Sequence, residues 1–93
     1  MEAVKADFSV MLKQVGWDNV LAISGGRYER YGESLVLPIR YGYAVRVSLM
    51  PNDLYKVERI FKRGMTVRVK EEWSDIYCEQ LGEVAYQASC YPD

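Results

Sequence analysis

Apolar residues recur with a helical period at both ends of the chain. A helix predicted over residues 3–15 carries a stripe of apolar side chains on one face: Val4, Phe8, Met11, Leu12 and Val15. Gly16 predicts the end of this helix, and Trp17 is placed to fold back on its last turn. A second stripe predicts a C-terminal helix from Glu71 onward, through Trp73, Ile76, Tyr77, Leu81, Val84 and Ala85.

Between the predicted helices, apolar and polar residues alternate as they do in half-buried strands. We predict a short strand over residues 20–23, followed by extended segments over residues 27–31, 35–40, 43–49, 55–62 and 65–70. Pro38 cannot donate a ladder hydrogen bond, so its strand is predicted to lie at an edge or to carry a bulge. Arg59 and Ile60 break the alternation, which predicts a bulge near them.

This order of elements predicts an α+β fold. Its simplest packing is an antiparallel four- or five-stranded meander with the N-terminal and C-terminal helices on one face. The chain has 93 residues, too few to bury two separate cores, so residues 1–93 are predicted to form a single domain. The first residues carry acids where a signal peptide would carry a basic region and an apolar core. No apolar run is long enough to cross a bilayer. We therefore expect a cytoplasmic protein without membrane contact.

Composition removes most of the usual catalytic chemistry. The chain has no His, which excludes imidazole bases, Ser-His-Asp catalysis and His-containing zinc sites. Cys78 and Cys90 match neither a redox motif nor a metal-binding pair, and we expect buried or half-buried thiols. The segment 24–26 resembles a fragment of a phosphate loop but leads into an extended pattern, which favours a simple turn. We expect a non-enzymatic protein without a cofactor or bound metal, and a core too small to enclose a ligand.

Charge is distributed unevenly, although the net charge is only −1. Residues 27–70 contain ten Lys and Arg and four acids, whereas residues 71–93 contain six acids and no base. The alternation predicts a basic open sheet face made by Arg46, Lys56, Lys62 and Arg68, with Arg27, Arg30 and Arg40 nearby and Tyr28, Tyr31 and Tyr41 interleaved. Such a face could follow a nucleic-acid backbone and stack bases. The simpler interpretation is a solvated face whose charges are partly neutralised by acids such as Glu58.

A series of residues resembles a pattern in small bacteriophage, prophage and mobile-element proteins that have no assigned activity. The pattern comprises Leu49, Asp53, Leu54, Tyr55, Val57, Arg63, Gly64, Glu72, Ile76, Tyr77 and Leu81. The resemblance extends from about residue 10 to the end of the chain. Many members end in Thr-Gly-Leu-Tyr, of which only Tyr91 is present here. The resemblance implies a phage or mobile-element origin, and small phage proteins without catalytic residues often bind a host protein, in host takeover or in blocking defence systems.

Because the composition offers little catalytic chemistry, we expect the protein to act by binding another molecule through its surface. We predict that the chain binds and modulates a host protein in the bacterial cytoplasm. Tyr and Arg concentrate binding energy at interfaces, and the candidate contacts are Arg27, Tyr28, Arg30, Tyr31, Arg40, Tyr41, Arg46 and Arg68. One alternative is a nucleic-acid-binding accessory protein that uses the basic sheet face. Another is a self-associating phage assembly component whose edge strand near Pro38 pairs between chains. An enzyme that uses carboxylates alone is the last alternative.

Overall fold

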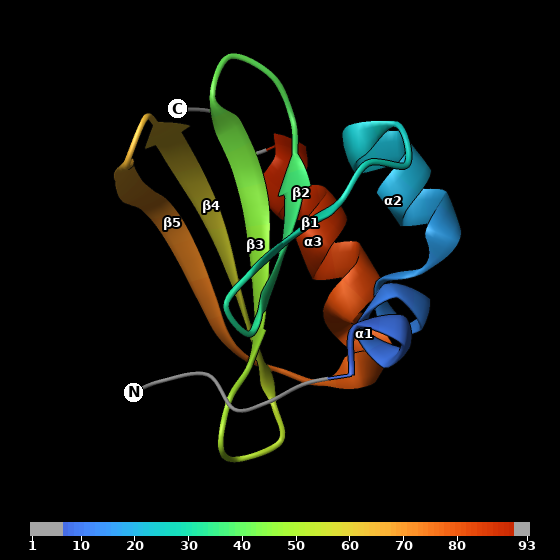
Figure 1. Cartoon of the computed structure of the whole chain (residues 1–93). Coiled ribbons are helices and arrows are strands. Elements are labelled where there is room, and N and C mark those ends of the chain that lie inside the picture. The colour runs from blue at the N-terminus through green and yellow to red at the C-terminus, as the bar shows by residue number, and fades with distance from the viewer. Residues whose placement is uncertain (1–6, 91–93) are drawn as a thin grey trace.

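The structure, a computed structural model, describes residues 7–90 (Figure 1). Its elements follow in the order α1 (Phe8–Val15), α2 (Trp17–Ser24), β1 (Glu29–Tyr31), β2 (Ser34–Pro38), β3 (Tyr43–Leu49), β4 (Tyr55–Arg63), β5 (Thr66–Ile76), the 3₁₀ turn η1 (Cys78–Gln80) and α3 (Leu81–Cys90). The strands form one antiparallel sheet in the order β1-β2-β3-β4-β5, and the helices lie on one side of it (Figure 1). The predicted α+β fold, an antiparallel meander flanked by N-terminal and C-terminal helices, is confirmed.

The first helix begins and ends at recognisable capping residues. The Asp7 carboxylate accepts a hydrogen bond from the Ser9 backbone N–H at 2.9 Å, which caps the start of α1. The predicted helical positions 3–6 lie outside the described residues. Gly16 ends the helix as predicted, because its φ of 93° suits glycine and its N–H bonds to the Leu12 carbonyl oxygen.

The predicted strand over residues 20–23 is wrong, because this segment belongs to α2. The carbonyl oxygen of Gly16 accepts the Val20 N–H at 3.0 Å, so a new helix starts directly after α1. Val20 and Ile23 are buried at a helical spacing of three residues. A run of four apolar residues suits a buried strand and a short helix equally well, and only packing against α3 and the sheet distinguishes them.

The C-terminal helix is shorter than predicted, because β5 continues to Ile76 and α3 begins only at Leu81. The error has a physical cause in two register shifts between β4 and β5, one of them between Arg59 and Ile60 as predicted. With extra residues inserted, Trp73 and Ile76 both lie opposite residues that reach the core although they are three apart. A bulged strand therefore imitates the spacing of a helix.

Pro38 lies in an interior strand and not in an edge strand, contrary to one prediction. Strand β2 pairs with both β1 and β3, but its pairing with β1 covers only Ser34–Val36. Pro38 is therefore opposite Ala44 of β3 on one side and opposite no β1 residue on the other. Its missing N–H costs no ladder hydrogen bond with β1.

The main core fills the space between the sheet and the helices. It is built from alternate strand residues and the inner side of each helix: Met11, Val15, Val20, Ile23, Leu35, Leu37, Val45, Val47, Tyr55, Val57, Leu81, Ala85 and Ala88. A second, smaller cluster of Val36, Ala44 and Ile60 lies on the opposite side of the sheet. We call that side the open face, and the other the helix face.

Candidate protein interface

Two cations of the open face, Arg46 and Lys56, lie against acids of the same face. The Arg46 guanidinium makes two hydrogen bonds to the Glu58 carboxylate, at 2.8 Å and 3.1 Å, and the Glu58 side chain is only 3% exposed. The Lys56 ammonium lies 4.0 Å from Glu58 and 3.9 Å from Glu72. Because these charges are compensated within the fold, Arg46 and Lys56 do not form a free basic track.

Two of the other predicted contacts are not on the open face. Residues that lie opposite each other in an antiparallel pair share a face. Arg68 lies opposite Phe61, whose ring packs edge-on against Tyr43 on the helix face, so Arg68 is separated from Arg46 by the sheet. Arg30 also faces the helices, where its guanidinium carbon lies 4.2 Å from the centre of the Phe8 ring. Of the four cations predicted on the open face, Arg46, Lys56 and Lys62 lie there, and the prediction is wrong for Arg68.

The open face is concave and filled. The Lys62 ammonium lies 3.6 Å from the centre of the Tyr31 ring, although β4 and β1 are not neighbours in the sheet. Side chains from all five strands surround a cavity of only about 30 Å³, lined by Tyr31, Val36, Arg46, Ile60, Lys62 and Val67. This volume suits at most one water molecule. Strong curvature thus removes the flat stacking platform that binding of single-stranded nucleic acid needs.

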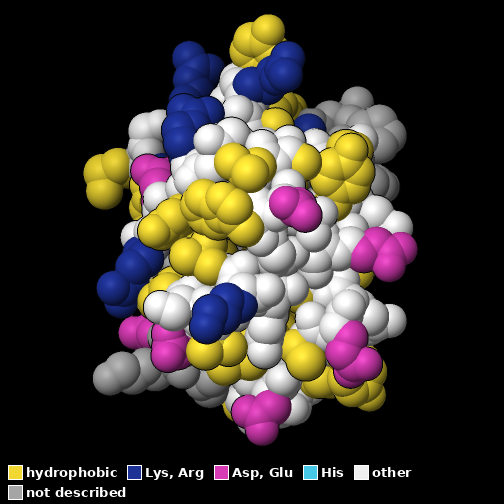
Figure 2. All heavy atoms as spheres, turned by 90° about the vertical axis from the view of Figure 1, so that its right-hand side faces the viewer, with side chains coloured by type: hydrophobic (Ala, Val, Ile, Leu, Met, Phe, Trp, Pro, Cys, Tyr) yellow, Lys and Arg dark blue, Asp and Glu magenta, His cyan; other side chains and the backbone are white. Residues whose placement is uncertain are grey.

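Four of the predicted residues do come together, at the end of the sheet that carries the β2–β3 turn. Arg27 and Arg40 line one concavity of about 300 Å³, which Lys62 also borders. The Arg27 Nε donates to the carbonyl oxygen of Ser24 at 3.3 Å. Within residues 7–90, no carboxylate forms an ion pair with either Arg27 or Arg40. Figure 2 shows Lys and Arg side chains gathered at this end of the molecule.

Tyr41 stands beside Arg40 at the tip of the same turn. Its side chain is 84% exposed and its φ is 55°, and the next residue, Gly42, has a φ of 88°. The Tyr43 N–H donates to the Arg40 carbonyl oxygen at 3.0 Å and closes the turn. Positive φ at both central positions suits Asn-Gly far better than a bulky aromatic residue. An exposed tyrosine held in a strained backbone conformation is typical of a functional position.

Two residues that were not among the predicted contacts extend this region. Trp17, which we expected to fold back on α1, is the first residue of α2 and is 51% exposed, and Leu21 one turn later is 48% exposed. Both pack around Gly26, where an added Cβ would lie 3.3 Å from the Leu21 Cδ2 and 3.8 Å from the Trp17 ring. We assigned residues 20–23 to a strand and therefore did not place Trp17 and Leu21 on one helix face. Their spacing of four residues was the signal in the sequence that could have indicated this.

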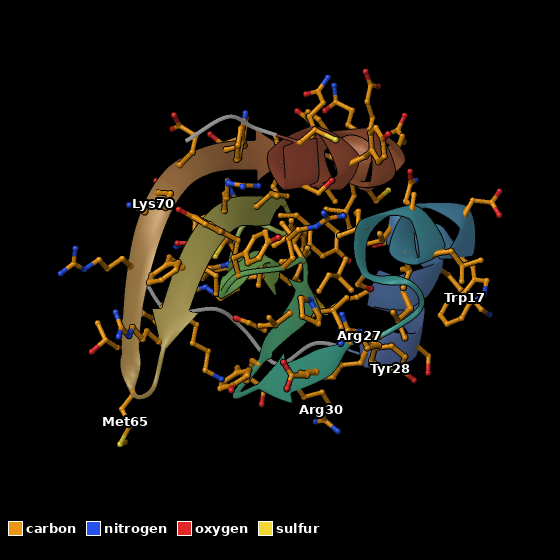
Figure 3. All side chains as sticks on the ribbon, turned by 90° about the horizontal axis from the view of Figure 1, so that it is seen from above. Trp17, Arg27, Tyr28, Arg30, Met65 and Lys70 are labelled. Carbon is orange, nitrogen blue, oxygen red and sulfur yellow. The ribbon has the colours of Figure 1, made fainter. Side chains whose placement is uncertain are left out.

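Together these residues form one continuous surface. Figure 3 shows Trp17, Arg27 and Tyr28 on the same side of the molecule, and Figure 2 shows hydrophobic side chains gathered over the helices below the basic end. We call it the Trp-Arg surface, and it comprises Trp17, Leu21, Arg27, Tyr28, Arg40 and Tyr41. Trp, Tyr and Arg are the residue types that contribute most to protein interfaces.

A groove of about 450 Å³ borders this surface, between α2, the β2–β3 turn and α3. The groove is open to solvent at the surface between the layers. The expectation that the core is too small to enclose a ligand concerned the interior and does not apply to this groove. Arg40 and Tyr41 line one wall, and Arg59 lies deeper. The Arg59 guanidinium donates to the carbonyl oxygens of Ala88 and Ser89, at 2.9 Å and 3.0 Å, near the C-terminal end of α3. Arg59 therefore stabilises that helix end.

Three other side chains in residues 7–90 have notable chemistry: Tyr55, Cys78 and Cys90. Burial raises the pKa of Tyr55, the neighbouring Cys78 raises it further, and the hydroxyl donates to the side-chain carbonyl of Gln14. Cys78 and Cys90 are both exposed free thiols, so the expectation of buried or half-buried thiols is wrong. Within the described part of the chain, no three His, Cys, Asp or Glu side chains converge on a metal position. None of the helices among these residues is long and apolar enough to cross a membrane.

Comparison of the chain with protein-family models, with curated proteins and with solved structures found no match.

Proposed function

We propose that this chain is a small non-enzymatic protein that acts by binding another protein through the Trp-Arg surface. The observation that carries the proposal is the half-exposed pair Trp17 and Leu21, which adjoins Arg27 and Tyr28. An exposed tryptophan beside arginine and tyrosine provides the large contact area and hydrogen-bonding capacity of an interface hot spot. The strained, exposed Tyr41 at the rim adds a further aromatic contact.

The charges of this surface specify the chemistry of the partner. Arg27 and Arg40 have no carboxylate partner among the described residues. A partner that places acidic side chains opposite them gains charge-assisted hydrogen bonds, which arginine makes in bidentate geometry. The partner is therefore a protein with an acidic rim around an apolar patch that accepts Trp17. Its place in a bacterial host, in host takeover or blocked defence, rests on the resemblance to phage and mobile-element proteins.

Nucleic-acid binding through the open face is disfavoured by the geometry described above. Arg46 is paired with Glu58, and the concave face is filled by its own side chains. A nucleic acid would have to use the basic end alone, where Arg27 and Arg40 are few contacts for a phosphate backbone.

Capture of tagged protein from bacterial lysate, with and without nuclease, tests the proposal. The captured partner is then purified and its dissociation constant measured by titration against the wild type and against Trp17→Ala and Arg40→Ala. We expect Trp17→Ala to weaken binding by about thirtyfold or more, since hot-spot truncations cost about 2 kcal/mol or more. Met65→Ala and Arg63→Ala remove an exposed apolar side chain and an exposed arginine from the β4–β5 turn, and serve as matched controls.

Two results would count against the proposal. Unchanged affinity in both Trp17→Ala and Arg40→Ala would exclude the Trp-Arg surface as the interface. Captured material that disappears on nuclease treatment, with an affinity that falls steeply with salt, would instead assign nucleic-acid binding.

A further inference from the structure

Strand β5 presents an open edge along the whole length of the longest strand in the sheet. It runs over Thr66–Ile76, pairs with β4 on one side, and has no partner among the described strands on the other. Most of its residues are exposed, and Figure 3 shows Met65 and Lys70 at the outer edge, on the opposite side of the molecule from Trp17. An unpaired edge exposes backbone donors and acceptors that another strand can satisfy.

The charges along β5 change sign at its middle. Its first half carries Arg68 and Lys70, and its second half carries Glu71, Glu72 and Asp75. A copy of the strand that runs antiparallel therefore brings the basic half against the acidic half at both ends of the contact. A parallel copy would place each charge beside its own counterpart, which is repulsive.

We propose that β5 pairs antiparallel with β5 of a second copy of this chain, about a two-fold axis between Val69 and Lys70. An interface of this kind must be self-complementary, because the same strand supplies both sides. The charge reversal within β5 meets that requirement. The pairing joins two five-stranded sheets into one continuous sheet and leaves the Trp-Arg surface of each copy free.

The register follows from the faces of the side chains. Arg68 lies opposite Phe61 and Glu71 opposite Arg59, and both of these β4 residues point to the helix face. In the proposed register Arg68 of each copy lies opposite Glu71 of the other, so both members of the new ion pair share a face. In the same register the half-exposed Val69 of each copy lies opposite Lys70 of the other, the residue that has no partner in β4.

Charge reversal provides a direct test in solution. The mass of the wild type is measured by sedimentation at concentrations up to about 100 μM, because a contact of one strand per copy gives a weak dimer. We expect a concentration-dependent dimer. Arg68→Glu alone and Glu71→Arg alone each place like charges opposite each other twice, so each should weaken the dimer about tenfold or more. An equimolar mixture of the two variants should dimerise again, because their heterodimer restores opposite charges at both positions.

Arg40→Glu is the matched control, since it changes charge in the same way on the Trp-Arg surface. It should dimerise like the wild type. The Arg68 side chain is exposed and the Glu71 side chain is half-buried, so both charge variants should fold. Circular dichroism of each variant checks this. A wild type that stays monomeric over the whole range, or a mixture that associates no better than the single variants, would overturn the proposal.

Discussion

Gly82 of α3 lies against the carbonyl group of Val15 at the end of α1, with no room for a side chain between them. A Cβ added at position 82 would overlap the Val15 oxygen and come within 2.6 Å of the Asn19 Nδ2. That Nδ2 donates to the same Val15 oxygen at 2.8 Å. The glycine therefore allows the close contact of α3 with the junction of α1 and α2.

Replacement of this glycine should destabilise the protein. Gly82→Ala gains about 1 kcal/mol of helix propensity but forces α3 away from Val15, and overpacking costs about 1–3 kcal/mol. We expect a lower midpoint in urea unfolding with an unchanged slope. Gln87→Ala, at an exposed position of the same helix, is the control and should change stability little. A Gly82→Ala variant more stable than the wild type would show that the helices separate without cost.

The Arg46–Glu58 pair should show the asymmetry of a buried ion pair. Glu58→Leu alone leaves Arg46 and Lys56 without their shared acid, and we expect a loss of about 2 kcal/mol or more. Because an apolar pair of similar size avoids the desolvation penalty, Arg46→Met/Glu58→Leu should be less destabilised than the sum of its single changes. Chemical unfolding of the four proteins completes the cycle. Strictly additive losses would mean that the two side chains do not interact.

Tyr55 should make stability depend on pH at the alkaline end. Burial raises its pKa in the folded protein above the usual value of 10.0 for a tyrosine, so the unfolded chain releases the phenol proton first as pH rises. Its contribution is present below pH 10.0 and is lost as pH increases through the raised value. Comparison of urea midpoints for the wild type and Tyr55→Phe from pH 8 to 11 isolates this residue from the other tyrosines.

At neutral pH, Tyr55→Phe should itself cost about 1 kcal/mol, because Gln14 loses the donor for its side-chain carbonyl. The difference between the two proteins should then shrink above pH 10. A constant difference across the range would contradict the raised pKa.

Tyr41 should show a conflict between stability and binding. Tyr41→Asn creates the Asn-Gly pair that this hairpin turn prefers, and we expect it to raise the free energy of unfolding by about 0.5–1 kcal/mol. The same change removes an exposed aromatic side chain from the Trp-Arg surface, so partner affinity should fall. Thermal unfolding and partner titration of this variant measure both effects. Loss of stability would show that the tyrosine ring supports the fold.

The sequence by itself determined the parts of this protein that depend on local pattern. Strand β3 alternates without interruption and was predicted with its observed bounds, and Gly16 marks the end of α1. Of the candidate site, Arg27, Tyr28, Arg40 and Tyr41 were predicted from their residue types. They are exposed in the structure because they lie in turns and loops, where side chains reach solvent whatever the strand register.

Tertiary structure decided everything that depends on register, curvature and packing. Bulges between β4 and β5 turned an apparent helix into strand, and the register set by the β4–β5 turn placed Arg68 opposite Phe61, on the other face from Arg46. Curvature brought Tyr31 to Lys62, and burial of Glu58 paired it with Arg46. Packing against α3 made a helix of residues 17–24 and exposed Trp17. These outcomes rest on contacts between residues far apart in sequence, and no local periodicity carries that information.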